Sequence, residues 1–464
     1  MLKNNKILLL FLNWLIYLLP LFYIVGNFPV NLNVTLITII GFIIYRWKIF
    51  DYKKDSILFL LSFFFLLIII FSIIENIINP GNIFINKSVI FLRYFFFALV
   101  IRCALIHNNI NLKKFLLSCF IFSIIISLDV ILQFSTGKNL IGLESPSLYR
   151  SSFFGNEYIS GGYIQRFSIL GFFSSYLIFK KKNLKIIVSL LFLILCFFGT
   201  FYSGNKMPFF MFTFFLGSVL IFLFIKLKIY KNKIFFIPFL ISLFLILLNG
   251  KKVELFFTDT LKNTYYFQHV NTFVGAAPKF KIIYSEITRD YTELEKYKGN
   301  TWFHFTEEFK NKSKYRYISK QSTYNHIYIT ALDLFLERPY IGRGIKSFRE
   351  TCKERVHLPN RICSTHQHNY HLQILNDTGL LGYLVFFGLI VLLIIACFKK
   401  KYLKNNIYFY SILCVIFIEL FPIRSTGGFF STMNSSFIFL MIGILLGLKK
   451  IDKSSKIIKN TFLR

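Results

Sequence analysis

Residues 56–78 read SILFLLSFFFLLIIIFSIIENII, and Glu75 is their only charged residue. A helix needs about 20 predominantly apolar residues to cross the hydrocarbon core of a bilayer, and this run is long enough. The whole chain has 464 residues, of which 55% are hydrophobic and 19% are aromatic, and its mean hydropathy is +0.59. The sequence therefore predicts an all-α, polytopic membrane protein.

Runs of the same kind recur along most of the chain. The first, residues 7–25, follows Lys3 and Lys6, but it is long and lacks a small-x-small cleavage site, so we expect an uncleaved first helix instead of a signal peptide. Counting the runs predicts about 12 transmembrane helices. They are centred in 7–25, 30–45, 56–78, 88–106, 112–134, 160–179, 184–202, 207–225, 234–250, 370–398, 407–422 and 434–448.

Lys and Arg gather in alternate short loops between these runs. Because cytoplasmic loops hold the excess of Lys and Arg, both termini are predicted to lie in the cytoplasm. The formal net charge of +33 is then largely a matter of topology, and it does not indicate nucleic-acid binding, which would need a basic face on a soluble domain. The cation-rich loops are 46–54, 113–114, 180–185, 226–233 and 399–404.

This topology divides the chain into four parts. Residues 1–250 are expected to form helices 1–9 and residues 370–448 helices 10–12, and the basic tail 449–464 is expected to contact anionic lipid headgroups. Between them, residues 251–369 are expected to form one large loop on the outer, non-cytoplasmic side, which is the candidate soluble domain. Its net basic charge is uninformative, because long loops escape the positive-inside rule. Helices are predicted inside this loop at 280–298, 322–337 and 345–355.

Two cysteines stand apart from the others. Five of the seven cysteines lie in predicted spans, whereas Cys352 and Cys363 both lie in the large outer loop. This division suggests a disulfide in an oxidising compartment, and two unrelated free thiols are the alternative. A bond between them would restrain the approach of the chain to His368.

A polar segment enters a hydrophobic helix near residue 369. Asn369, Gln373, Asn376 and Asp377 follow helical spacing and form one polar stripe on an otherwise apolar helix. Such a stripe must face the protein interior or water. His368 lies at the outer end of the stripe, where an imidazole can exchange protons near neutral pH.

His366, His368 and His371 allow three interpretations. Imidazoles at these spacings can converge on zinc, but neither an HExxH motif nor a second cluster of ligands accompanies them. A structural histidine cluster is the second interpretation. The third is a general acid or base, and it requires a substrate.

Basic residues spread over the same outer face suggest that substrate. Arginine forks suit phosphate oxygens, so together these residues would form a cradle for a pyrophosphate. Taken singly, each is also explained as a solvated or lipid-snorkelling cation. The residues are Arg150, Arg166, Lys206, Arg338, Arg343, Arg349, Arg361 and Arg424.

Two sequence patterns suggest a family. His368-Asn369 is followed, after nine residues, by Gly379-Leu-Leu-Gly382. Asp377-Thr378-Gly379 ends at the first glycine of that motif. Upstream stands Pro339-Tyr-Ile-Gly342-Arg-Gly344. These patterns resemble the O-antigen ligase and polymerase superfamily, which are polytopic glycosyltransferases of the GT-C type. That family has a His-Asn and Gly-x-x-Gly pattern, a Glu-Thr-Gly element and a Pro-Leu-x-Gly-x-Gly element.

Two weaker similarities and two departures complete the comparison with that family. Arg150-Ser-Ser-Phe-Phe-Gly-Asn156 looks like the family's outer arginine segment, and Tyr202-Ser-Gly-Asn-Lys206 looks like its Ser-Arg turn, with Lys206 in place of Arg. The family often has a further Arg before the proline element, where this chain has Tyr324 or His326. His326 would replace that Arg only when protonated.

The resemblance implies glycan transfer on the periplasmic face of the bacterial inner membrane, in lipopolysaccharide biosynthesis. The donor would be an undecaprenyl-pyrophosphate-linked polysaccharide and the acceptor a sugar hydroxyl of the lipid A core, with inversion at the anomeric carbon and without a metal ion or cofactor. His368 would be the base for the acceptor hydroxyl. The candidate substrate-binding residues are Arg150, Lys206, Arg343, Arg424, Asn369 and His326.

Three rival functions remain alternatives. A polymerase of the same superfamily would transfer the glycan to a lipid-linked repeat unit, and an oligosaccharyltransferase would transfer it to protein Ser or Thr. A glycolipid flippase or transporter is the rival from another class. Against it, the runs show no two-fold repeat, and cations deep in the spans are few, with Arg93 and Arg102 the clearest.

Overall fold

A computed structural model describes residues 2–51, 55–79, 84–145, 149–155, 157, 159–179, 181–227, 323–356, 361–400, 406–422, 424–425 and 427–451. Within these ranges the protein is all-helical, with 14 α-helices and no β-strand. The predicted span at 234–250, the predicted helix at 280–298 and the tail beyond 451 lie outside the described residues.

The N-terminal half of the described chain consists of nine α-helices with two 3-10 turns between them. Each predicted apolar run of this half that is described coincides with helical residues. The helices are α1 (Leu2–Tyr17), α2 (Leu19–Val25), α3 (Asn27–Tyr45), α4 (Ser56–Ile78), α5 (Phe84–Ile106), α6 (Leu112–Thr136), α7 (Ser160–Ile178), α8 (Lys182–Tyr202) and α9 (Lys206–Leu227), and the 3-10 turns are η1 (Arg46–Phe50) and η2 (Ser152–Phe154).

The described C-terminal part contains two α-helices and a 3-10 turn, followed by three helices at the predicted positions of spans ten to twelve. The helix predicted at 322–337 corresponds to α15, and the one predicted at 345–355 is shorter than expected and continues as a 3-10 turn. The elements are α15 (Thr323–Glu337), α16 (Phe348–Thr351), η6 (Cys352–Arg355), α17 (Tyr370–Lys399), α18 (Ile407–Glu419) and α19 (Thr432–Lys450).

Seven of the described helices are long and apolar enough to cross a membrane, and the number is eight if one bent pair counts as a single span. The seven are α3, α4, α5, α6, α8, α17 and α19. The chain is therefore a multi-pass membrane protein, as its composition predicts.

Three of the predicted spans are not simple helices. The first bends by 54° between α1 and α2, because Pro20 has no N–H to continue the helix and its ring crowds the preceding turn. α18 has 13 residues and is about 20 Å long, which is shorter than a hydrocarbon core of about 30 Å. It ends just before Phe421-Pro422, where a residue that precedes proline disfavours helix.

The third is α17, which is broken at Gly379. The backbone there has φ 64° and ψ −176°, which is far from helical. The C-terminal piece, residues 380–399, is about 30 Å long and can span a bilayer alone. The N-terminal piece, residues 370–378, is therefore available to build the polar end of the molecule.

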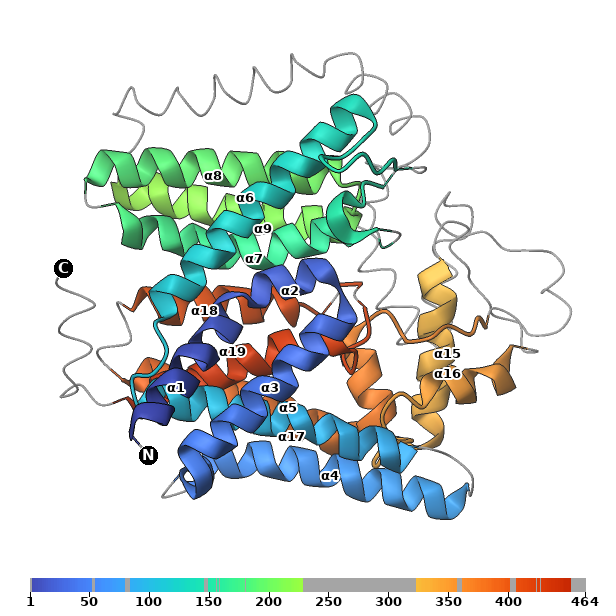
Figure 1. Ribbon diagram of the computed structural model, residues 1–464. Coiled ribbons are helices and arrows are strands. Elements are labelled where there is room, and N and C mark those ends of the chain that lie inside the picture. Colours follow the sequence, from blue (N-terminus) through green and yellow to red (C-terminus); the bar gives the residue numbers. More distant parts are fainter. Residues whose placement is uncertain are drawn as a thin grey trace, which may run out of the picture.

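The helices pack in two groups, as Figure 1 shows. α6, α7, α8 and α9 form one group, and α3, α4, α5, α17 and α19 form the other, with α18 packed on α7 and α19. α19 is buried along nearly its whole length. It lies close to α5 because Gly443 and Gly447 leave room for Ala98 and Leu105, so a Cβ on either glycine would lie 2.8 Å from α5 atoms. α15 and α16 cover one end of the bundle.

Candidate functional site

The break in α17 is filled by the turn that follows α15. The Leu380 N–H donates to the Pro339 carbonyl at 2.7 Å, and the Leu381 N–H donates to the Tyr340 carbonyl at 3.2 Å. A Cβ on Gly379 would lie 2.3 Å from the Tyr340 oxygen, and one on Gly342 would lie 2.5 Å from the Gly379 nitrogen. Only glycine permits this approach of two backbones. The two glycine motifs that are distant in sequence are thus halves of one joint.

Asp377 extends this joint toward α16. Its carboxylate accepts the Lys346 N–H at 2.8 Å and the Ser347 hydroxyl at 3.3 Å, and its carbonyl accepts the Gly344 N–H at 2.9 Å. Asn376 donates its side-chain amide to the Ala331 carbonyl of α15 at 3.0 Å. Both side chains are buried, so the predicted polar stripe faces the protein and binds the outer segments to α17.

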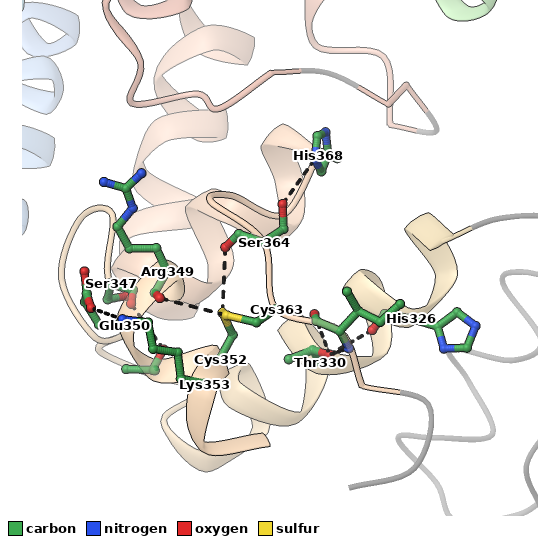
Figure 2. Close-up of a disulfide and its surroundings, with 12 residues drawn as sticks. His326, Thr330, Ser347, Arg349, Glu350, Cys352, Lys353, Cys363, Ser364 and His368 are labelled. Carbon is green, nitrogen blue, oxygen red and sulfur yellow. Dashed lines mark hydrogen bonds and ion pairs between the residues drawn. A yellow bond between two sulfur atoms is a disulfide. The ribbon is translucent and has the colours of Figure 1, made fainter. Parts of the chain in front are cut away.

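A disulfide joins the outer segments to one another. Cys352 and Cys363 are bonded, and their Cα atoms lie 5.1 Å apart (Figure 2). Cys352 belongs to a small apolar cluster with Ile327, Leu334 and Phe348, against which Cys363 packs. The bond therefore restrains the chain at Cys363, five residues before His368.

His368 lies at the junction of these segments, just before α17. Its backbone adopts φ 54°, a left-handed conformation that is uncommon outside glycine. The imidazole Nε2 lies 3.4 Å from the Ser364 hydroxyl oxygen. The ring centroid is 4.9 Å from that of Tyr324 and 4.1 Å from that of His366. The side chain is only half-buried, so an ionisable ring stands at the edge of a firmly anchored segment.

Asn369 is the N-cap of α17. Its side-chain oxygen accepts the Leu372 N–H at 3.1 Å, and its amide donates to the carbonyls of Pro422 at 2.8 Å and Arg424 at 3.3 Å. Asparagine is among the preferred residues at this position, because it satisfies an N–H that the helix leaves unpaired. Asn369 thus has a structural role in fixing where His368 stands, and it is buried.

The three histidines do not converge. The two nitrogens of His371 contact the Tyr383 hydroxyl and the Leu420 carbonyl, each at 2.9 Å, and its ring stacks on Phe387. His366 and His368 alone lie side by side. Among the residues that the structure describes, no group of three or more His, Cys, Asp or Glu side chains is arranged to hold a metal ion.

Arg150 and Lys206 belong to two outer segments that are bound together. The Arg150 N–H donates to the Ser203 carbonyl at 3.0 Å, three residues before Lys206. Asn205 accepts the Gly161 N–H at 2.8 Å, which ties the same turn to the start of α7. Burial lowers the pKa of both Arg150 and Lys206, and both side chains are half-buried. The structure therefore assembles two cations from different parts of the chain.

Tyr149 and Tyr324 connect these cations with the histidine. The ring of Tyr324 lies against that of His368. Partial burial is the main cause that raises the pKa of Tyr324, and the nearby Tyr149 phenol is the second. His326, two residues farther along α15, points its ring away from His368 in Figure 2. Of the two residues expected where the family has Arg, Tyr324 is therefore the one beside the histidine.

Five more of the predicted cations form ion pairs with carboxylates of the protein. Arg343 is buried and forms an ion pair with Glu337, and Arg424 is buried and bonds Glu419 at 2.7 Å. The Glu419 carboxylate also accepts hydrogen bonds from Nε and Nη2 of Arg166, at 3.0 and 2.9 Å. Two guanidinium groups therefore share one carboxylate. Farther out, Arg338 pairs with Glu75 and Arg361 pairs with Asp333.

These ion pairs change the expected cradle. Arg343 and Arg424 each contact a carboxylate of the protein, and a backbone hydrogen bond brings Arg150 next to the turn that contains Lys206. The acidic partner that sequence reasoning missed is Glu419. A signal for it existed, because Glu419 is the only charged residue of the apolar helix α18, and such residues rarely stand unpaired in a membrane.

Comparison with known families matches the central part of this chain. Residues 160–387 match the profile of the O-antigen ligase family, and this segment contains Lys206, Tyr324, His368 and both glycine elements of the α17 joint. Comparison with curated proteins finds no match. Members of the matched family are glycosyltransferase-like ligases and polymerases. The chain therefore carries a domain of the O-antigen ligase family, within the superfamily that its histidine motif resembles.

Proposed function

We propose that this protein is an O-antigen ligase that transfers a polysaccharide from undecaprenyl pyrophosphate to a sugar hydroxyl of the lipid A core. The observation that carries the proposal is the presentation of His368. Its half-buried ring stands in a left-handed backbone position, between an N-cap, a disulfide and the α17 joint. Strained backbone that several contacts hold in place is typical of functional sites.

In the proposed reaction, His368 acts on the acceptor. The imidazole takes the proton of the acceptor hydroxyl as its oxygen attacks the anomeric carbon of the donor sugar. The bond between that carbon and the pyrophosphate oxygen breaks on the opposite face, so the configuration inverts. The released pyrophosphate keeps the bonding electrons.

Arg150 and Lys206 are proposed to bind the leaving pyrophosphate. Fixed cations that already point at a developing negative charge stabilise it without further reorganisation. Both groups are half-buried, which strengthens their interaction with an anion relative to water. In this assignment Arg343, Arg424 and Asn369 hold the site in shape and do not contact the donor, and His326 is a peripheral contact at most.

The proposed location is the bacterial inner membrane with the site in the periplasm. The alternation of cationic loops supports cytoplasmic termini, and the disulfide supports an oxidising outer compartment. We retain residues 251–369 as the periplasmic domain, residues 1–250 and 370–448 as the membrane domain and residues 449–464 as the cytoplasmic tail. The proposed partners are the lipid-linked donor, the glycan acceptor and membrane lipids.

The test is His368→Gln, expressed in the native host, with lipopolysaccharide separated on a gel. We expect the banded, glycan-bearing lipopolysaccharide to disappear while long chains accumulate on the lipid carrier. His107→Gln is the matched control. His107 lies just after the C-terminal end of α5, and its ring stacks on Tyr45. Wild-type banding in the His368 variant at equal protein level would refute the proposed base.

The same experiment separates the rival functions. Loss of a polymerase leaves single repeat units on the lipid A core, whereas loss of a ligase leaves long chains on the carrier. Loss of an oligosaccharyltransferase removes glycan from protein and leaves the lipopolysaccharide ladder intact. Purified protein should also form product from donor and acceptor in proteoliposomes, which a flippase would not do.

A further inference from the structure

A second group of cations lies at the same end of the bundle, on the α5 side of the disulfide. Lys87 and Arg93 belong to the first turns of α5, and Lys346 and Arg349 belong to the turn before α16 and to α16 itself. We call these four residues the α5–α16 basic cluster. In Figure 2 the Arg349 side chain extends to the side of the disulfide opposite His326.

The cluster concentrates positive charge. Desolvation lowers the pKa of Lys346, and so do Arg93, Lys87 and Arg349, all of which repel its ammonium group. Within the described part of the chain, Arg93, Lys346 and Arg349 form no ion pair with a carboxylate, and Glu350 beside them is paired with Lys353. The Arg93 Nε is also buried without a hydrogen-bond partner among the described atoms. Such a group of cations attracts an anion.

The backbone at Lys346 is held in an unfavourable conformation. Its φ is 57°, in the left-handed region, and the Asp377 carboxylate fixes its N–H at 2.8 Å. Glycine would adopt this conformation without strain, so a lysine side chain is retained there at a local energetic cost. His368 has the same property, and both residues flank the N-terminal piece of α17.

The depth of the cluster indicates a lipid-borne anion. The apolar span of α5 begins at Ile85, so Lys87 and Arg93 lie roughly 3 Å and 12 Å along it. Lys346 and Arg349 are exposed. The Arg93 guanidinium donates to the Tyr94 hydroxyl at 2.9 Å, and that hydroxyl lies 3.5 Å from the Thr432 carbonyl at the start of α19. The four cations therefore lie near the level at which lipid phosphates meet water.

We propose that the α5–α16 basic cluster binds a phosphate group of the lipid-linked acceptor. The inference rests on the proposed transfer function and adds a second substrate site to it. Arg150 and Lys206 bind the donor pyrophosphate on the Tyr324 side of His368, and the cluster holds the acceptor on the Ser364 side.

The test compares acceptors with and without phosphate. Full-length protein in phosphatidylcholine nanodiscs is given an undecaprenyl-pyrophosphate-linked glycan and either rough lipopolysaccharide or the same lipid stripped of phosphate by hydrofluoric acid. For Lys346→Gln combined with Arg349→Gln, we expect the KM for the phosphorylated acceptor to rise about tenfold or more. The kcat and the donor KM should stay unchanged.

Two controls accompany the double variant. Lys138→Gln removes an exposed cation that is paired with Glu144 in the loop after α6, so it should leave the acceptor KM unchanged. Lys346→Arg keeps the charge and should retain most of the acceptor affinity. With the stripped acceptor, wild type and double variant should have the same raised KM. An unchanged KM in the double variant, or an equal rise with both acceptors, would overturn the proposal.

Direct binding separates this proposal from the proposed function. Fluorescent rough lipopolysaccharide should bind the wild-type protein about tenfold more tightly than the double variant, without any donor present. Weaker binding of the variant in a protein that transfers nothing would support the phosphate site and refute the ligase. Equal binding in an active enzyme would refute the phosphate site alone. If the variant effect vanishes when phosphatidylglycerol is added, the cluster binds bulk anionic lipid and the acceptor assignment fails.

Discussion

Gly379→Ala tests the joint between α17 and the turn that follows α15. The substitution places a methyl group where the two backbones meet, 2.3 Å from the Tyr340 oxygen and 2.6 Å from the Gly342 nitrogen. Neither obstacle is the end of a flexible side chain. The turn must therefore move away from α17, and the segment that carries His368 loses its support.

The size of the effect follows from what the joint contains. The backbone conformation of Gly379, φ 64° and ψ −176°, is nearly restricted to glycine and costs an alanine about 1–3 kcal/mol. Moving the turn also breaks four backbone hydrogen bonds between 2.7 and 3.2 Å long, which contribute about 1 kcal/mol each. The sum is about 5–7 kcal/mol, which places the variant among severely destabilising substitutions.

The assay is thermal unfolding of the purified protein in detergent, together with glycan transfer in proteoliposomes. Gly388→Ala is the matched control, because it changes the same residue type in the same helix and its Cβ would have no neighbour within 4 Å. We expect Gly379→Ala to lose transfer and to melt far below wild type, and Gly388→Ala to resemble wild type. Similar melting temperatures and activities for the two variants would refute the joint as a structural requirement.

Three further variants probe other parts of the site. Glu419→Gln leaves two buried guanidinium groups without their carboxylate, which lowers the free energy of unfolding by about 3–5 kcal/mol. We expect the variant to aggregate during size-exclusion chromatography. A wild-type elution profile would contradict the pairing. Cys352→Ser opens the disulfide, whose sequence separation is 11, and should cost about 3 kcal/mol; its melting temperature should fall and become insensitive to reductant. Burial lowers the pKa of Lys206, so its charge is lost as pH rises through a value below the ordinary one for lysine. The donor KM should therefore rise at alkaline pH. Lys206→Arg should move that rise to higher pH. If the two proteins gave superimposable profiles of donor KM against pH, Lys206 would not bind the donor.

Much of the helical layout could be predicted from the sequence. α4 coincides with its predicted run at 56–78, because a helix in lipid needs only a local property, a long apolar segment whose backbone bonds are internal. Breaks are less visible. Pro20 and Pro422 are local signals for the α1–α2 bend and for the end of α18, but the break at Gly379 depends on a turn about forty residues upstream that occupies it.

The candidate site divides in the same way. His368 could be singled out from the sequence, since a titratable side chain at the entrance of an apolar helix is rare, and Cys352 and Cys363 could be paired because they alone share the outer loop. The partners of the cations could not be predicted. Charge and residue type are the same for Arg150 and Arg424, yet one lies beside the Lys206 turn and the other is buried against Glu419.

The sequence by itself determined that this protein crosses a membrane many times, where its polar segment enters a helix and which family domain it carries. Each of these depends on the order of residues within one segment. The tertiary structure alone decided that Tyr324 and not His326 lies beside His368, and that Arg343 and Arg424 form ion pairs with carboxylates of the protein. These contacts connect residues far apart in the chain, and their geometry is set by how the helices pack.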